Sequence, residues 1–295
     1  MYPQAESTLL SVRRAQYETH DVTTLVTEPA GGGKAPAFAP GQYCMLTAAG
    51  SGEIPISISG DPARADQLVF TVRASGAASS LLARQGPGDT IRMRGPFGNS
   101  WPLQEAVKSD LLLIGGGMGL AALRPVIYAA AQDRPSFGRV FVLCGARTPG
   151  DLIYTRELAA WSRLSRTEVH AIVEMGGPGW NGGLGRVTRF FDQIQLRPEN
   201  TVAMTCGPEP MMRSVAAELL ARGFEDDRVF LSMPTLREDG PIYAYGDVCA
   251  FDASGQRKAS WTLAQALAPP LPSFPQNAGS CGLVPHSIQR FQFDR

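Results

Sequence analysis

The first part of the chain, up to about residue 100, carries short runs of alternating or β-branched residues and no long amphipathic helical pattern. Glycine, proline and aspartate separate the runs, as at Gly60-Asp61-Pro62, and these residues favour tight turns. About six strands at such short spacing are typical of a small antiparallel barrel. We therefore predict a barrel over residues 1–100, with a short helix at Ser79–Arg84. The expected strands are Thr8–Val12, Val22–Val26, Gln42–Thr47, Pro55–Ser59, Leu68–Arg73 and Thr90–Arg94.

After Trp101 the pattern changes to apolar strands that alternate with helical stretches. This alternation predicts a parallel, doubly wound sheet over residues 101–233, with the junction near Gly98–Trp101. The fold class predicted for the whole chain is therefore β followed by α/β. The expected strands are Leu111–Ile114, Val140–Cys144, Glu168–Glu174, Thr201–Thr205 and Arg228–Leu231, and the expected helices are Leu120–Gln132, Glu157–Leu164, Val187–Asp192 and Pro210–Arg222.

The last stretch, residues 234–295, has weak periodicity. Within it, Ala268–Gln276 is too rich in proline for a regular helix or sheet. We expect an irregular segment here, which from about Ala253 is a loosely ordered tail or an arm that packs on a partner.

Composition narrows the classes of function. Lysine plus arginine and aspartate plus glutamate number 27 each, so the net charge gives no reason to expect nucleic acid or an anionic membrane as a partner. Five cysteines, with no C-x-x-C pair, favour reduced thiols over a disulfide framework. The N-terminus lacks a signal-peptide layout, and no apolar run is long enough to span a bilayer. We expect a cytoplasmic protein without membrane insertion.

A glycine cluster, Gly115-Gly116-Gly117-Met118-Gly119, directly follows the apolar strand Leu111–Ile114. Glycines at such a turn let the backbone approach a pyrophosphate, and the N–H groups that open the next helix favour an anion. The cluster is not the full dinucleotide fingerprint, and no acidic residue clearly marks a ribose at the usual spacing. A tight turn without a ligand is the alternative explanation.

A second strand-to-helix turn, Thr205–Met212, contains Cys206-Gly207-Pro208 and Met211. Open α/β sheets bind ligands at the carboxyl ends of their strands, so Cys206 is a candidate catalytic residue lining a nicotinamide pocket. Taken alone, a small buried hydrophobic role is the more common one for a cysteine.

In the barrel, two strands carry candidate cofactor contacts. Pro55-Ile56-Ser57-Ile58 and Thr71-Val72-Arg73 offer hydroxyl and backbone groups for a flavin, and Arg73 offers a guanidinium for its phosphates. Ser57 is the second candidate catalytic residue. The alternative is two ordinary barrel strands with solvated polar side chains, and Gly95-Pro96-Phe97-Gly98 fits a linker turn equally well.

Taken together in their order along the chain, these motifs resemble those of the ferredoxin–NADP reductase superfamily over roughly residues 5–247. The closer likeness is to electron-transfer subunits that carry an iron–sulfur cluster. These are the gamma (diaphorase) subunit of cytosolic nickel–iron hydrogenases or sulfhydrogenases, the B subunit of anaerobic sulfite reductase, and the electron-transfer subunit of dihydroorotate dehydrogenase. The resemblance implies further cofactor-binding residues, which are Gly76, Ala78, Ser79, Gly95, Gly98, Ala146, Arg147 and Asp151.

The resemblance also implies FAD and NAD(P)H as cofactors, and redox subunits, possibly of a nickel–iron hydrogenase, as partners. A free-standing NAD(P)H:flavin or dye reductase and a non-catalytic subunit that kept the fold are the alternatives. Arg147 lies on the ribose side by resemblance, where it could contact a 2′-phosphate, and a surface arginine is the alternative. Whether the nicotinamide is NAD or NADP stays open.

One departure from the resemblance concerns the cluster. Related subunits hold a [2Fe–2S] cluster with four cysteines placed after a segment like Phe230–Met233. Here Met233 leads through Pro234–Asp239 straight into Gly240–Tyr245, and only Cys249 and Cys281 lie beyond. We therefore expect no metal ligands and no [2Fe–2S] cluster bound by this chain alone.

Overall fold

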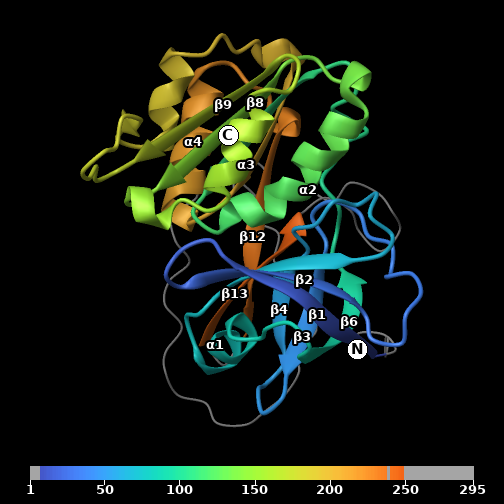
Figure 1. Ribbon diagram of the computed structural model, residues 1–295. Coiled ribbons are helices and arrows are strands. Elements are labelled where there is room, and N and C mark those ends of the chain that lie inside the picture. The colour runs from blue at the N-terminus through green and yellow to red at the C-terminus, as the bar shows by residue number, and fades with distance from the viewer. Residues whose placement is uncertain (1–6, 238–239, 249–295) are drawn as a thin grey trace, which may run out of the picture.

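The computed structural model describes residues 7–237 and 240–248, and the side chains up to Ser232. In this part of the chain, two sheets lie one above the other, as Figure 1 shows. No described helix combines the length and the apolar character needed to cross a bilayer.

The antiparallel sheet curls into a nearly closed barrel with the strand order β4-β3-β6-β1-β2-β5. An isolated bridge between Ile58 and Phe70 brings its two edge strands together. Alternate residues such as Leu10, Leu46 and Phe70 fill the barrel and are fully buried. The strands are β1 Thr8–Tyr17, β2 Val22–Pro29, β3 Tyr43–Ala48, β4 Ile54–Ser57, β5 Leu68–Arg73 and β6 Thr90–Phe97, and the helix α1 is Ala77–Ala83.

The second sheet has the order β10-β9-β8-β7-β11-β12-β13 and is parallel from β10 to β12. Its central strand is buried on both faces, as expected for a strand between two helical layers. The strands are β7 Asp110–Gly116, β8 Val140–Ala146, β9 Thr167–Val173, β10 Gly183–Leu184, β11 Thr201–Cys206, β12 Val229–Arg237 and β13 Gly240–Val248. The α-helices are α2 Gly119–Gln132, α3 Thr155–Trp161 and α4 Glu209–Ala221.

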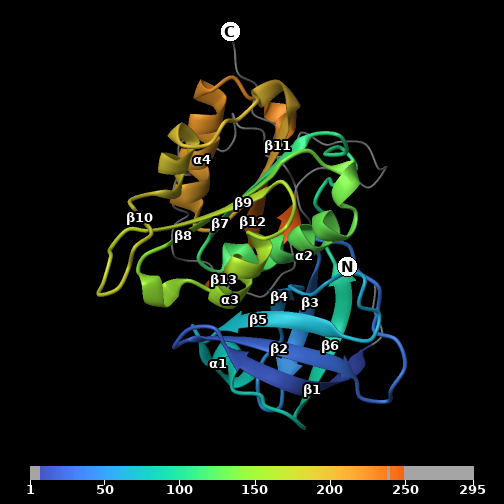
Figure 2. The same cartoon turned by 45° about the horizontal axis from the view of Figure 1, so that its top comes forward.

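Two hydrophobic cores confirm that the sheet is doubly wound. Leu111 and Leu113 of β7 pack with α2 and α3 on one face, and Leu112 and Ile114 pack with α4 on the other. Between Val187 and Asp192 the chain forms a 3-10 helix in place of the short helix expected from the sequence, and it packs on the α4 face. Figure 2 shows the helices on the two sides of this sheet.

The segment after Phe230 differs from the expectation. Residues 234–295 were predicted to be irregular, but residues 234–237 continue β12 and Gly240–Val248 form β13. β13 pairs antiparallel with β12, with register shifts near Pro234, and it lies beside β4 of the barrel. Pairing with β12 supplies hydrogen bonds that compensate for a weak local pattern. The proline-rich stretch and the expected tail lie outside the described residues.

Candidate functional site

Two cavities meet in the cleft between the barrel and the parallel sheet. The barrel cavity has a volume of about 760 Å³ and lies against β4, β5 and the start of α1. The sheet-edge cavity has a volume of about 460 Å³ and lies at the carboxyl ends of β7, β8, β9 and β11. This is the edge at which open α/β sheets bind ligands. The two cavities share lining residues, which are Arg73, Gly116, Gly117, Met118, Pro208 and Pro210.

The barrel cavity gathers most of the residues predicted to contact a flavin. Pro55, Ile56 and Ser57 of β4 line it, and so do Thr71 and Arg73 of β5. The segment that opens α1 completes the wall with Gly76, Ala78 and Ser79. The Ser79 hydroxyl accepts hydrogen bonds from the backbone N–H groups of Ser75 and Gly76, at 3.1 and 2.9 Å, and so fixes this turn.

Arg73 stands at the boundary of the two cavities. Its Nε donates to the Asp21 carboxylate at 2.6 Å, and Asp21 also accepts from the Thr19 hydroxyl at 2.8 Å. Burial acts to raise the pKa of Asp21, but the hydrogen bonds from Arg73 and Thr19 outweigh it and lower the pKa below its ordinary value. Asp21 is therefore ionised at neutral pH, and its pairing orients a guanidinium that still has donors for an anion.

The turn between β7 and α2 lies at the boundary of the two cavities, and its backbone lines both of them. Gly117 has a φ of +52°, in the left-handed region, and its N–H donates to Gly145 O at 2.8 Å. A Cβ on Gly119 would overlap the carbonyl group of Cys206, and one on Gly116 would overlap the Met211 sulfur. The glycines thus let two strand-to-helix turns press together, and the first turn leads directly into the N-terminus of α2, where the helix dipole favours an anion.

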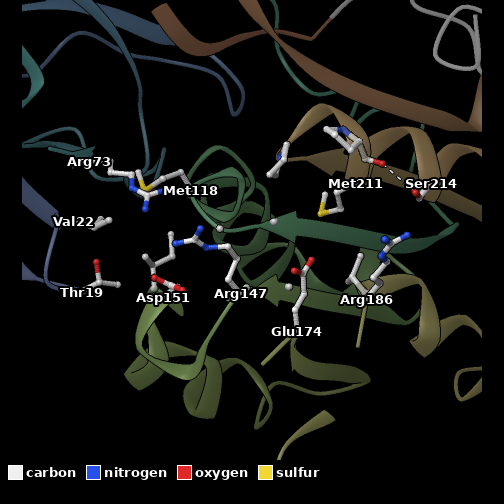
Figure 3. Close-up of a pocket in the computed structure, with 18 of the residues that line it drawn as sticks. Thr19, Val22, Arg73, Met118, Arg147, Asp151, Glu174, Arg186, Met211 and Ser214 are labelled. Carbon is white, nitrogen blue, oxygen red and sulfur yellow. Dashed lines mark hydrogen bonds between the residues drawn. The ribbon is translucent and has the colours of Figure 1, made fainter. Parts of the chain in front are cut away.

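The sheet-edge cavity is lined by charged side chains from successive strand ends. Ala146 ends β8 and Arg147 follows it, and Glu174 follows β9, with its N–H donating to Ala146 O at 3.1 Å. Figure 3 shows Arg147 between Asp151 and Glu174, with Arg186 farther along the same cavity. The Asp151 carboxylate accepts from the N–H and hydroxyl of Thr148, at 3.1 and 2.8 Å, and so holds the turn behind Arg147.

Some predicted site residues lie away from both cavities. Cys206 is fully buried, and burial raises the pKa of its thiol to about 12 although Ser232 hydrogen-bonds to it. Cys206 therefore does not line either cavity, contrary to the expectation, and its catalytic role stays a prediction. Ile58 and Val72 are equally buried, because alternate strand positions point into the barrel core.

The remaining predicted glycines do not line either cavity. Some allow a close backbone contact beside the cavities, and others lie in a turn away from them. Gly119 and Gly207 shape the tight contact between the two strand-to-helix turns, and Gly115 allows Leu120 of α2 to approach its own strand; none of the three lines a cavity. Gly95 and Gly98 lie at the end of β6, where Gly98 O accepts from the Gln42 side chain at 3.1 Å, so they belong to a structural turn. Neither glycine lines one of the two cavities.

Several residues of the site were missed from the sequence. Thr19, Asp21 and Val22, at the β1–β2 turn, reach the sheet-edge cavity from the barrel. Glu174 and Arg186 reach it from strand and loop ends that carry no motif. An acidic residue at the end of an expected strand was an available signal for Glu174, whereas the approach of residues 19–22 depends on how the two sheets pack.

Comparisons with known proteins agree with this architecture. The family described as oxidoreductase NAD-binding domain matches residues 113–217. The chain is 32% identical over 235 residues to sulfhydrogenase 1 subunit gamma of Pyrococcus furiosus, covering 72% of this chain and 80% of that protein. It is 32% identical over 216 residues to the electron transfer subunit of dihydroorotate dehydrogenase B (NAD(+)) of Geobacillus kaustophilus, covering 71% and 77%.

Among solved structures, a ferredoxin NADP+ reductase from Neisseria gonorrhoeae with bound FAD and NADP shares the fold. The TM-score is 0.65 at 22% identity, over 77% of this chain and 98% of that chain. The flavohem-like FAD/NAD binding domain of nitric oxide dioxygenase from Vibrio cholerae gives a TM-score of 0.67 at 21% identity, over 76% and 97%. The paired cavities, the fold and these similarities together place the chain in the ferredoxin–NADP reductase superfamily, among the relatives of sulfhydrogenase gamma subunits and dihydroorotate dehydrogenase electron transfer subunits.

Proposed function

We propose that the protein is an FAD-containing NAD(P)H oxidoreductase that passes electrons between a nicotinamide and a partner redox subunit. The observation that carries the proposal is the meeting of the two cavities at Met118, with a glycine-shaped turn between them. When bound there, FAD accepts a hydride from the nicotinamide and can release its two electrons one at a time. A redox subunit of a nickel–iron hydrogenase-type complex is our proposed partner, since the similar sulfhydrogenase protein is named as a subunit.

The barrel residues fit the binding of a flavin. Pro55, Ile56, Ser57 and Thr71 give the cavity an apolar wall with hydroxyl groups at its edge, which suits a fused aromatic ring. Arg73, together with the turn at Gly76–Ser79, would hold the phosphates, since a guanidinium fork matches phosphate oxygens. The role of these side chains is to orient the ring and exclude water.

The sheet-edge residues fit a dinucleotide. The N–H groups at the start of α2 and the backbone of Gly116–Met118 would take the pyrophosphate, and Pro208 and Met211 would flank the nicotinamide end. Arg147, with Asp151 behind it, would face the adenosine ribose. We also propose that residues 1–100 form the flavin domain and 101–233 the nucleotide domain.

We propose further that this chain alone binds no [2Fe–2S] cluster. Cys44 is buried in the barrel core and Cys144 and Cys206 in one core of the parallel sheet, and burial raises the pKa of each thiol to about 12. Within the described residues, no group of three or more histidine, cysteine or acidic side chains could hold a metal ion. Cys249 and Cys281 lie outside those residues.

The sequence gap where related subunits carry cluster cysteines favours a second function, a free-standing NAD(P)H:flavin or dye reductase. A pull-down from native extract and a turnover assay separate the two. The partner proposal expects iron–sulfur or nickel–iron subunits to co-purify, and faster NAD(P)H oxidation when they are added back. Isolation as a lone monomer that reduces free flavin as fast as it oxidises NAD(P)H would establish the second function instead.

A further inference from the structure

A buried polar cluster joins the barrel to the parallel sheet behind the two cavities. We call it the clasp and define it as Ser59, Thr71, Arg124, Tyr154 and Glu157. Its members come from β5, the end of the β4 segment, α2, and the start of α3. Thr71 lines the barrel cavity, and Tyr154 directly follows Ile153, which lines the sheet-edge cavity. The clasp therefore touches the walls of both cavities at once.

The first connection in the clasp is a hydroxyl pair. The Tyr154 Oη and Thr71 Oγ1 atoms lie 2.5 Å apart, and Thr71 Oγ1 also lies 2.9 Å from Ser59 Oγ and 3.1 Å from Thr24 Oγ1. Tyr154 is 1% exposed and Thr71 is 4% exposed. Burial raises the pKa of Tyr154 to about 12, so the phenol keeps its proton.

The second connection is an arginine. Arg124 Nη1 donates to the backbone carbonyl of Ser59 at 2.8 Å, and its other side forms two hydrogen bonds to Glu157, at 2.9 and 2.7 Å. The guanidinium carbon lies 4.5 Å from the centroid of the Tyr154 ring. Burial acts to lower the pKa of Arg124, but the neighbouring Tyr154 oxygen and Glu157 carboxylate outweigh it and raise the pKa. The arginine is thus charged and held on three sides.

The backbone at Tyr154 is fixed as tightly as the side chain. Its φ of +58° lies in the left-handed region, which a tyrosine rarely adopts. Its N–H donates to the Glu18 carboxylate at 3.2 Å, next to the β1–β2 turn that lines the sheet-edge cavity. A side chain held in a strained backbone conformation by partners from both sheets is typical of a site that needs a defined geometry.

We propose that Tyr154 and Arg124 are positioning residues that set the distance between the flavin and the nicotinamide. The inference rests on the proposed function, in which NAD(P)H loses a hydride and becomes NAD(P)+, and FAD gains that hydride with both electrons. Neither residue touches the reacting atoms. The two rings are held by different sheets, so their spacing depends on how those sheets are joined, and a shift of about 1 Å can slow such a reaction about a hundredfold.

The test is rapid-mixing reduction of the FAD-loaded protein by NAD(P)H without oxygen. Tyr154→Phe removes one oxygen atom and is expected to lower the limiting rate of flavin reduction on the order of tenfold. The dissociation constants of FAD and NAD(P)H should change less than about twofold, because the residue lines neither cavity. The charge-transfer absorbance between the stacked rings should weaken in parallel with the rate.

Matched variants separate positioning from stability. Thr71→Val should slow reduction to a similar extent, and the double variant should be no slower than either single one. Thr27→Val is the control, since Thr27 is a buried threonine whose hydroxyl bonds to Leu68 O within the barrel, and it should reduce at the full rate. The melting temperature of each variant is measured beside the rate.

The outcomes are distinct. An unchanged rate and charge-transfer band in Tyr154→Phe would overturn the inference, and so would a rate loss that Thr27→Val shares. A double variant slowed by the product of the two single effects would also overturn it, because the two hydroxyls would then act independently. If NAD(P)H does not reduce the wild-type protein at all, the proposed function itself fails, and this inference fails with it.

Discussion

Replacing Gly119 with alanine is expected to lower both the free energy of unfolding and the affinity for NAD(P)H. A Cβ at this position would overlap the backbone carbonyl of Cys206, and a backbone group cannot rotate away as a flexible side chain can. The β7–α2 and β11–α4 turns must then separate. Overpacking of this kind costs about 1–3 kcal/mol, and we expect the upper part of that range here. The displaced N–H groups should weaken dinucleotide binding at least about tenfold, which corresponds to the loss of roughly one charge-assisted hydrogen bond.

Urea unfolding and titration of NAD(P)H check this result. Gly52→Ala is the matched control, because a Cβ on Gly52 meets no atom within 4 Å and the residue lies in the loop before β4. We expect the control to change the free energy of unfolding by less than about 0.5 kcal/mol, as exposed substitutions generally do. Equal stability and equal NAD(P)H affinity in the two variants would show that the tight turn has no part in dinucleotide binding.

Replacing Arg147 with alanine is expected to have the second large effect. It should reduce the preference of the protein for NADPH over NADH. Arg147 and Arg186 both line the sheet-edge cavity, and the carboxylate of Glu174 lies in the same cavity. A hydrogen bond from a guanidinium to a phosphate is worth about 1.5–3 kcal/mol. We therefore expect the KM for NADPH to rise about 10- to 150-fold, while the KM for NADH changes less than about twofold, because NADH has no 2′-phosphate.

Steady-state kinetics with both nicotinamides measure this difference. Arg147→Lys keeps the charge but loses the planar fork, and its KM for NADPH should lie between those of the wild type and Arg147→Ala. Arg163→Ala removes an exposed arginine that lines neither cavity, and both constants should stay unchanged. If Arg147→Ala raises the two Michaelis constants alike, Arg147 does not contact a 2′-phosphate.

The parts of the fold predicted from the sequence are those in which local pattern and tertiary contacts agree. Leu111–Ile114 is apolar throughout because β7 is buried on both faces, and the glycines that follow it are needed for a close backbone contact. β13 was missed because its pairing partner, β12, compensates for a weak local pattern. The hydrophobic pattern of a single segment does not show whether a distant strand will pair with it.

The candidate site was only partly predictable for a related reason. Thr71 and Arg73 were found because they follow a strand pattern, and the structure places both at the barrel cavity. The side on which Cys206 lies could not be inferred, because both faces of a doubly wound sheet are buried. The role of Tyr154 could not be inferred from the sequence, since its partners Thr71 and Glu18 lie 83 and 136 positions away in the chain.

The most direct test of the proposed function is a visible spectrum of the purified protein, loaded with FAD and then mixed with NADPH or NADH without oxygen. We expect about one FAD bound per chain, and loss of its flavin absorbance when about one equivalent of nicotinamide is added, since a hydride carries two electrons. A chain that binds no FAD, or a bound flavin that stays oxidised with both nicotinamides, would contradict the claim that the two cavities form one oxidoreductase site.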